Sequence, residues 1–456
     1  MPVIRLLQTG LVFTCIFILA TSCSQTENTT SDQNLVYSVH IAPIIHAKCS
    51  PCHRPGSSAP INLLTFEDVT SRLKTIQLVI NSGIMPPWPA DPEYVSFKGE
   101  KALTHNEKSL INNWIEAGAP EGNPKLSPPL PVFHDNSFLG KPDMVLQIPN
   151  PVFIKGDNQD KFYMLKIPFE FPQDTFIKAI EIVPGNKKLV HHVNAHIVQY
   201  DRGEKADHTK GLPYVDTEKH DKQKAYELLD LPNDDGTYPL LSPSVSNFLP
   251  GVEPVLYPEG IGGIKVTKQG VLLLDNMHYG PSPVDTSDQS SFNIFFSPSA
   301  PKRPLKEMIL GTSGITRIDP PLIIPPDTVM SFTTEYRVPS DMSIVTINPH
   351  MHLLGKSFHA YAMTPSGDTI RLIRIPEWDF KWQYFYTYKK IQKIPARSVI
   401  KVHGVFDNTS ANPNNPFDPP RTVTERAGSM RTTDEMFQLI ISWMPYQNGD
   451  ENISLE

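Results

Sequence analysis

Short segments that are apolar, or that alternate apolar and polar residues, dominate the chain beyond residue 140. Alternate residues of a strand face the same side, so segments of this kind, bounded by Pro, Gly, Asn and Asp, predict β-strands. We therefore expect two consecutive all-β sandwich domains, over 141–298 and 299–456. The clearest strand segments are 163–171, 176–184, 270–280, 343–355 and 437–445.

The pattern between residues 36 and 120 is helical instead, with apolar residues on one face of two segments. Thr65 is followed three residues later by Asp68, which is the capping pattern that begins a helix. The pair Thr104 and Glu107 repeats this pattern before the second segment. The sequence therefore predicts a small all-α domain ahead of the β domains.

Two segments follow neither pattern. Residues 121–140 are rich in proline and predict a semi-rigid linker. The stretch from Asp201 to Asp230 is dense in charge and predicts an insertion loop, with a short helix near its end. The first segment connects the expected helical domain to the β domains, and the second is an insertion within the first β domain.

The N-terminus has the features of an export signal over residues 1–22, with a positive charge ahead of the apolar run 10–20. That run is too short for a membrane span of about 20 residues. Cys23 follows three small residues, as in a bacterial lipobox, and the polar residues 23–35 form a flexible tether. We expect an exported lipoprotein, anchored by lipid and facing the periplasm or cell surface. An ordinary signal peptide, with Cys23 incidental, is the alternative.

Charge and cysteine content argue against a nucleic-acid-binding protein and against a disulfide-stabilised one. The formal net charge is −7 with both signs mixed, which argues against a nucleic-acid partner, since such proteins carry clustered basic residues. Only Cys49 and Cys52 of the 4 cysteines lie beyond the signal and the lipid-bearing position. A disulfide framework is therefore not expected, and packing and metals must stabilise the fold.

Cys49, Cys52 and His53 form the sequence C-x-x-C-H. A zinc site would need a second pair of soft ligands, and a thioredoxin-like dithiol would lie near a βαβ pattern. The adjacent histidine instead matches c-type haem attachment. We expect one covalent haem c, with His53 as the proximal iron ligand, and assign residues 36–120 as a cytochrome c domain.

Met85 lies in a Pro-rich loop downstream of this motif. A thioether on the second face of the iron raises the haem potential and suits electron transfer. The surrounding "SGIMPPW" resembles the distal loop of small class I cytochromes c. We expect Met85 to be the sixth ligand; a methionine packed against the ring edge is the alternative.

Five histidines lie in three apolar strand contexts. A satisfied core histidine is the default reading for any one of them, but recurring pairs favour metal binding. His350 and His352 are two apart and can share one metal without distortion. Adjacent residues of a strand point to opposite faces. His191 and His192 can therefore bind one metal ion together only at a strand end, a bulge or a twisted edge. We predict such an irregularity at that position. His278 is the fifth histidine.

The segments "HH", "MHYG", "HMHLLG" and "TTDEM", in this order, resemble the copper type II, ascorbate-dependent monooxygenases. That family includes peptidylglycine α-hydroxylating monooxygenase and dopamine β-monooxygenase. The resemblance spans about Lys141 to Glu456 and implies two jelly-roll-like β domains, with one copper on each, facing a solvent-filled cleft. It implies that the electron-transfer copper is bound by His191, His192 and His278, and the oxygen-binding copper by His350, His352 and Met436.

The ligand chemistry agrees with this division. Three imidazoles suit both Cu(I) and Cu(II), whereas two imidazoles and a thioether favour Cu(I), the state that meets dioxygen. The chain departs from the peptide-amidating members at Asn348, where they have a carboxylate-gripping arginine, and at Gln438 and Ile440. A glycine-extended peptide is therefore not the expected substrate. The family's disulfides are also absent, since no cysteine follows Cys52.

The resemblance implies an oxidoreductase that hydroxylates a C–H bond with dioxygen, with His350, His352 and Met436 as catalytic residues. We expect the fused haem to relay electrons to the copper sites from an external donor, either an ascorbate-like reductant or a redox protein. The substrate, a small molecule or a peptide, is not specified. Two alternatives remain: a non-enzymatic, membrane-anchored electron carrier, and a copper-storage or copper-sensing lipoprotein.

Overall fold

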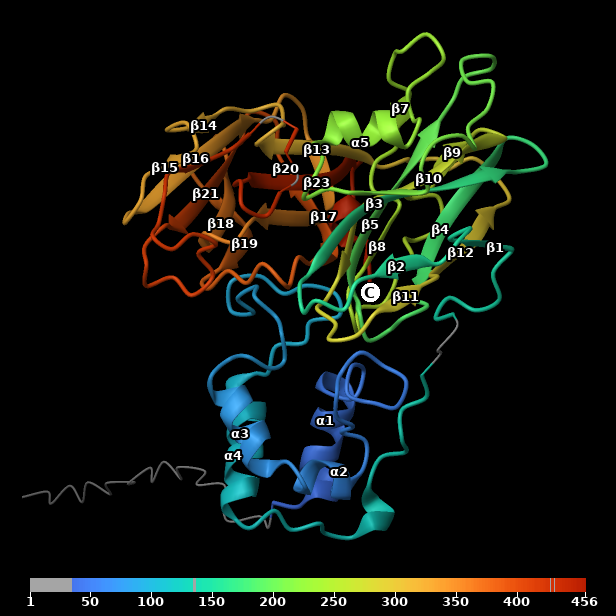
Figure 1. Ribbon diagram of the computed structural model, residues 1–456. Helices are drawn as coiled ribbons and strands as arrows, with labels where there is room; N and C mark the ends of the chain where they lie inside the picture. Colours follow the sequence, from blue (N-terminus) through green and yellow to red (C-terminus); the bar gives the residue numbers. More distant parts are fainter. Residues whose placement is uncertain (1–34, 134–136, 427, 430) are drawn as a thin grey trace, which may run out of the picture.

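The computed structural model describes residues 35–133, 137–426, 428–429 and 431–456 (Figure 1). The expected signal peptide and Cys23 lie outside these ranges. Among the described helices, none has both the length and the hydropathy needed to cross a membrane.

Strands dominate the protein, and the prediction of an all-α cytochrome domain is wrong. The chain is 35% strand and only 12% helix, and the part that the structure describes contains no clear all-α unit. The helices between residues 36 and 120 are short, and long irregular stretches separate α1 from α2 and α3 from α4. They are η1 (Tyr37–Ile41), α1 (Ala42–Lys48), α2 (Phe66–Thr70), α3 (Leu73–Asn81) and α4 (His105–Glu116).

The capping patterns are present, but they do not determine the length of the helices. Both boxes form: Thr65 Oγ1 accepts from the Asp68 amide, and Thr104 Oγ1 from the Glu107 amide, each at 3.1 Å. A cap sets where a helix begins but not how far it extends. The helix that begins at Thr65 is interrupted between α2 and α3, and four prolines within residues 85–92 exclude a helix from the next stretch.

The N-terminal segment is also not self-contained. Its helices share a small core around Trp114, but the stretch after α3 packs against the C-terminal sheets (Figure 1). Phe97 is 1% exposed, and its ring centroid lies 5.0 Å from that of Tyr386 and 5.2 Å from that of Tyr388. Asp91 adds an ion pair with Arg374 at 2.5 Å. The first hundred residues therefore contribute directly to the core of the last hundred and fifty.

Two main antiparallel sheets enclose the core of residues 141–298, where Leu272, Phe292 and Ile294 are fully buried. The strand orders are β1-β12-β4-β9 and β6-β3-β10-β5-β7, with β8 paired to β5 and a separate β11-β2 pair. The strands are β1 (Met144–Gln147), β2 (Val152–Ile154), β3 (Lys161–Glu170), β4 (Thr175–Val183), β5 (Val190–Gln199), β6 (Tyr214–Asp216), β7 (Leu240–Leu241), β8 (Ser246–Phe248), β9 (Ile264–Val266), β10 (Gln269–Tyr279), β11 (Thr286–Asp288) and β12 (Ser291–Ser297).

Residues 299–456 form a second pair of antiparallel sheets around Phe332, Phe358 and Phe437. The orders are β13-β23-β17-β20 and β14-β16-β21-β18-β19, with a β15-β22 pair beside them. The strands are β13 (Lys306–Gly311), β14 (Ile318–Asp319), β15 (Ile323–Ile324), β16 (Val329–Arg337), β17 (Met342–Met351), β18 (Gly355–Met363), β19 (Thr369–Ile375), β20 (Tyr386–Ile394), β21 (Val399–Asp407), β22 (Val423–Thr424) and β23 (Phe437–Pro445). A short 3-10 helix, η3 (Asp450–Asn452), follows β23. Another, η2 (Pro124–Leu126), lies before the first sheet pair.

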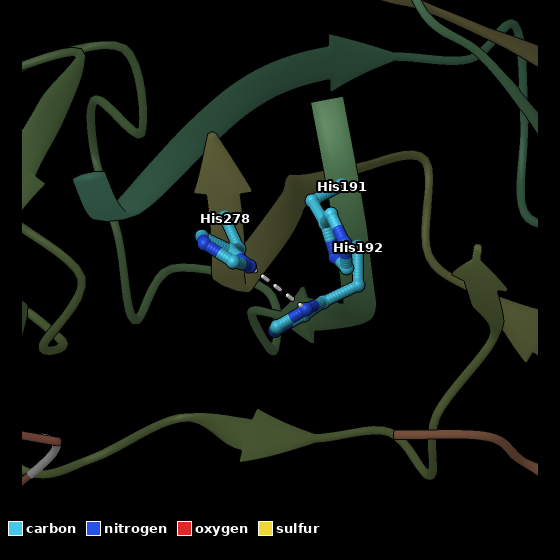
Figure 2. A group of neighbouring side chains, drawn as sticks. All are labelled: His191, His192 and His278. Carbon is cyan, nitrogen blue, oxygen red and sulfur yellow. Dashed lines mark hydrogen bonds between the residues drawn. The ribbon is translucent and has the colours of Figure 1, made fainter. Parts of the chain in front are cut away.

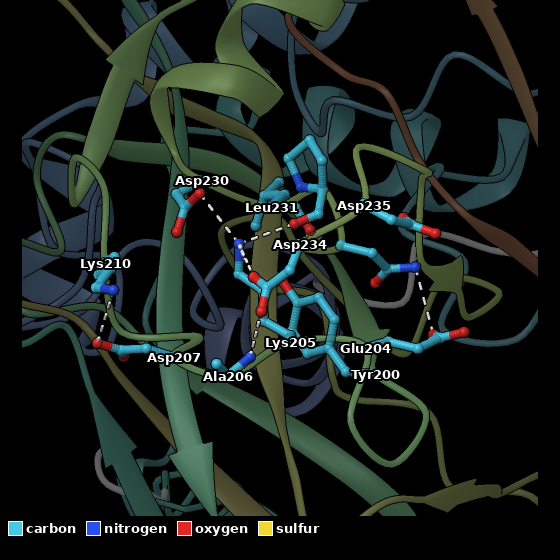
Figure 3. A network of polar contacts seen from close by, with 12 residues as sticks. Tyr200, Glu204, Lys205, Ala206, Asp207, Lys210, Asp230, Leu231, Asp234 and Asp235 are labelled. Carbon is cyan, nitrogen blue, oxygen red and sulfur yellow. Dashed lines mark hydrogen bonds and ion pairs between the residues drawn. The ribbon is translucent and has the colours of Figure 1, made fainter.

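The charged insertion folds back on the first sheet pair and contains the predicted short helix, α5 (Lys222–Leu228). Figure 3 shows its polar network, in which the buried Lys205 ammonium contacts Asp230 at 3.0 Å and Asp234 at 3.9 Å. Tyr200 Oη donates to the Leu231 carbonyl at 3.0 Å. The insertion is thus held by specific contacts between its two ends.

The insertion also crosses to the second sheet pair. The Lys222 amide donates to the Gly428 carbonyl at 2.8 Å, and the Thr432 amide donates to Glu218 Oε1 at 3.0 Å. Gly428 and Thr432 belong to the loop that leads into β23. The insertion therefore holds the loop that carries Met436 at two points.

Replacement of Phe97 tests whether the N-terminal segment belongs to the C-terminal core. We expect Phe97→Ala to lower the free energy of unfolding by about 3–5 kcal/mol, because it leaves a cavity beside Tyr386 and Tyr388. Denaturant unfolding of the full chain measures this loss. Phe153→Ala is the matched control, since Phe153 is 52% exposed and its loss costs about 0.5 kcal/mol or less. Equal effects of the two variants would contradict the packing described above.

Candidate metal centres

Three of the predicted histidines converge where β5 and β10 pair. The ligand nitrogens of His191, His192 and His278 all lie within 4.8 Å of one another (Figure 2). His192 and His278 are direct partners across the two strands. Among the described residues, this is a cluster that could hold a metal ion.

The strand irregularity predicted at this position is confirmed. His278 pairs with His192, but the next residue, Tyr279, pairs with Val190, so the register skips His191. An extra residue on one strand is a β-bulge, which turns the local side chains away from strict alternation. The bulge explains how two adjacent histidines reach the same point.

The three rings face one another, and one hydrogen bond joins two of them. It links the Nδ1 atoms of His192 and His278, which are 3.2 Å apart (Figure 2). His278 Nε2–H donates to Asp160 Oδ1 at 2.7 Å, so its Nδ1 holds a lone pair in the neutral ring. His191 Nδ1 is buried and has no hydrogen-bond partner among the described residues. A buried polar atom of this kind costs free energy unless a ligand satisfies it.

Burial also keeps the rings of His191 and His192 uncharged. Desolvation, followed by repulsion from His278, lowers the pKa of His191 to about 4. Desolvation lowers the pKa of His192 well below its ordinary value. A metal binds neutral imidazole, so His191 and His192 can accept a cation at neutral pH without releasing a proton. The hydrogen bond from His278 holds the pKa of the Asp160 carboxyl below its ordinary value, leaving a negative charge beside the cluster.

The second predicted site lies at the end of β17. The ring centroids of His350 and His352 are 5.0 Å apart. Met436 directly precedes Phe437, and the register partner of Phe437 is Met351, between the two histidines. Met436 is 8% exposed and lines the same cleft as His350. The structure therefore places His350 and His352 at the end of β17, beside Met436 just before β23.

Outer hydrogen bonds fix the tautomers of both histidines. His350 Nδ1–H donates to Gln383 Oε1 at 2.8 Å, and the Gln383 amide nitrogen is fixed in turn by the Phe380 carbonyl at 3.0 Å. His352 Nδ1–H donates to the Asp434 carbonyl at 2.8 Å. In each neutral ring, Nε2 then carries the lone pair, as in metal-ligating histidines held by an outer partner. Burial, then His352, lowers the pKa of His350 to about 3.

The Glu435 side chain connects the two segments that carry this site. The carboxylate is 1% exposed and accepts from the amides of His352 at 3.0 Å, Leu354 at 2.7 Å and Met436 at 3.2 Å. Burial raises the pKa of Glu435 to about 8, although the three backbone donors oppose this shift. The side chain thus joins the end of β17 to the residue before β23.

Both sites open on one cleft of about 250 Å³ between the two sheet pairs. His192 lines one wall and His350 the other, and His350 is among the groups that lower the pKa of His192. Most of the remaining lining is apolar or carries a neutral amide. These residues include Leu249, Val252, Ile309, Ile440, Asn194, Asn247, Asn276 and Asn348.

Aromatic rings bridge the two sites. Phe162 stacks on His278 with centroids 4.4 Å apart, and its ring lies 6.1 Å from Phe380. Phe380 in turn lies 5.6 Å from His352. Sequence reasoning missed these rings, together with Asp160, Gln383 and Glu435. Glu435 has a local signal, because it directly precedes a predicted ligand; the others lie far along the chain from their partners.

The predicted haem residues lie on two separate loops. Cys49, Cys52 and His53 share one turn after α1, where the amides of Cys52 and His53 donate to the Cys49 carbonyl at 3.2 and 3.0 Å. Both cysteines are free thiols, and burial raises the pKa of Cys49 to about 12. His53 Nδ1–H donates to the Ile61 carbonyl at 3.2 Å, leaving Nε2 as the lone-pair nitrogen. Met85 lies after α3 and lines a groove of about 1000 Å³ with Trp88 and Trp382.

Asp160 provides a test of the first site. Asp160→Asn weakens the acceptor that orients His278, so we expect copper affinity at this site to fall about 10–100-fold. Competition titration with a copper chelator measures the change. Asp157→Asn is the control, because Asp157 pairs with Lys161 at 2.7 Å and does not contact the histidines. Unchanged affinity in Asp160→Asn would contradict the proposed orientation of His278.

Comparison with known proteins does not identify a family. No family model matches the chain, and no curated protein matches it. Solved structures that match include the VP2 subviral particle of infectious bursal disease virus, at 8% identity over 70% of this chain and 75% of that one, with a TM-score of 0.17. The Gt strain structure of the same virus matches at 11% identity over 71% and 77%, with a TM-score of 0.16. The Gx strain structure matches at 8% identity over 71% and 77%, with a TM-score of 0.18. Similarity at this level supports no inference about fold or function.

Proposed function

We propose that the protein is a copper-dependent monooxygenase with one copper on each side of the cleft. The observation that carries the proposal is the convergence of His191, His192 and His278, with ligand nitrogens within 4.8 Å of one another; His192 and His278 are buried and His191 is partly buried. A second pair, the partly buried His350 and the buried His352, has its Nε2 atoms left free by outer hydrogen bonds. The order of motifs that resembles the copper monooxygenases gives the same division of ligands.

The donor sets support copper at both sites. Imidazole nitrogen favours copper most strongly among the common divalent metals, and the soft Met436 sulfur favours Cu(I) at the second site. Copper held there would supply the redox chemistry that activates dioxygen. The residues of this chain hold the ligands in one orientation, through Gln383 and the Asp434 carbonyl, and shield them from bulk water. Asp160 balances positive charge at the first site.

Substrate specificity follows from the cleft wall. Asn348 occupies the position of the carboxylate-gripping arginine, and its Nδ2 is already committed to the Tyr384 carbonyl at 2.8 Å. Gln438 Nε2 donates to the Thr312 carbonyl at 2.6 Å. Neither side chain offers a cation to a substrate carboxylate. The proposal is therefore hydroxylation of a C–H bond in a molecule other than a glycine-extended peptide.

The proposal includes one covalent haem c at Cys49, Cys52 and His53. The residues fit this group: two free thiols and a histidine share a turn, and His53 presents Nε2 because Nδ1–H is bound to a carbonyl. Met85 is the proposed sixth ligand. Electrons from an external donor would pass through this haem, and a lipid on Cys23 would anchor the chain to a membrane.

Metal content and oxygen consumption test the proposal together. With ascorbate, copper and oxygen, we expect one iron and two coppers per chain and steady oxygen consumption. His278→Ala should retain one copper, and Met436→Ile should cut oxygen consumption by at least about tenfold, which is about 1.4 kcal/mol of activation free energy. His359→Ala, on β18 outside both sites, is the control and should behave as the wild type.

The other outcomes separate the remaining functions. Reversible haem redox chemistry without oxygen consumption would identify an electron carrier. Copper binding without oxygen chemistry or haem reduction would identify a storage or sensing lipoprotein. Two coppers retained in His278→Ala would contradict the assignment of ligands.

A further inference from the structure

We propose that Tyr384 and Trp382 form the electron route between the haem loop and the copper site at His191. This inference rests on the proposed function, since it needs both a haem at Met85 and a copper at His191. It adds residues that neither the motifs nor the ligand sets include. The route is defined by contacts between the loop that follows α3 and the segment between β19 and β20.

The first contact joins the haem loop to Tyr384. Tyr384 Oη donates to the Pro87 carbonyl at 2.6 Å, only two residues beyond Met85. Trp88, the next residue, has its ring centroid 5.0 Å from that of Tyr384. A short hydrogen bond and a ring contact therefore connect the backbone of the proposed iron ligand to one buried phenol.

The second contact continues to the metal site. The rings of Tyr384 and Trp382 are stacked, with centroids 6.3 Å apart and planes 20° apart. Trp382 then lies 5.3 Å from His191. His191 is the histidine whose buried Nδ1 lacks a hydrogen-bond partner among the described residues. The series of rings thus ends on a proposed copper ligand.

The same segment is held rigidly by the second site. Asn348 Nδ2 donates to the Tyr384 carbonyl at 2.8 Å. Gln383, which lies between Trp382 and Tyr384 in the sequence, accepts a hydrogen bond from His350 at 2.8 Å. Tyr384 is 3% exposed. Electron tunnelling through protein falls steeply with distance, so a fixed series of short ring-to-ring steps is favoured over a longer path.

The transfer is a balanced one-electron step. A ferrous haem held at Cys49, Cys52 and His53 would lose one electron and become ferric, and a Cu(II) ion held by His191, His192 and His278 would gain it and become Cu(I). No bond forms or breaks, and no proton needs to move. Burial raises the pKa of Tyr384 above its ordinary value, so its hydroxyl keeps the hydrogen bond to Pro87 throughout.

Anaerobic stopped-flow measurement of the full chain tests the route. The haem is reduced, the copper site is loaded with Cu(II), and haem oxidation is followed by absorbance while the copper signal is followed by electron paramagnetic resonance. We expect Trp382→Leu to slow haem oxidation by at least about tenfold. Copper content and the haem spectrum should remain those of the wild type. Trp382→Phe, which keeps a ring, should transfer faster than Trp382→Leu.

Two further variants keep the test decisive. Tyr384→Phe retains the ring but removes the hydrogen bond to Pro87, and should also slow transfer, even if Trp382→Leu fails to fold or bind copper. Trp443→Leu, on β23 and outside the route, is the matched control and should transfer at the wild-type rate.

The experiment distinguishes failure of the electron route from failure of the proposed function. Wild-type rates in Trp382→Leu and Tyr384→Phe, with haem and copper both bound, would overturn the route and leave the proposed function standing. A wild-type protein whose reduced haem is not oxidised by its copper would overturn the route and the haem relay together.

Discussion

The burial of imidazole nitrogens without protein partners is the constraint on which this structure depends. An unsatisfied buried donor or acceptor costs about 1–3 kcal/mol, so imidazole nitrogens of this kind are costly to maintain. His191 Nδ1 and His192 Nε2 are both buried and have no hydrogen-bond partner among the described residues. A metal ion bound at this point would offset the cost, which is why the cluster indicates a ligand and not a core.

The rest of the fold serves to hold this cluster opposite a second one. The bulge in β5 turns two adjacent histidines to one point, and Glu435 joins the end of β17 to Met436. The charged insertion reaches across from the first sheet pair to the loop that carries Met436. The N-terminal segment contributes Phe97 to the core of the second sheet pair, against Tyr386 and Tyr388 of β20. These contacts connect all parts of the chain around one cleft.

Local patterns predicted some of this arrangement. The bulge followed from the geometry of adjacent histidines, and both capping boxes and the insertion helix followed from short-range spacing. The all-α domain was predicted wrongly, because caps and a haem motif do not encode how a Pro-rich stretch packs on distant sheets. Asp160 and Gln383 could not be predicted, since each contacts a histidine 118 or 33 residues away, and sequence spacing does not fix contacts across such separations. The metal ligands and the haem remain predictions that no comparison tests.

The most direct test is diffraction from copper-loaded crystals, recorded on both sides of the copper absorption edge. The account predicts two anomalous peaks, one bonded to His191, His192 and His278, and one bonded to His350, His352 and Met436. Peaks on other histidines, or no peak among the first three, would contradict it.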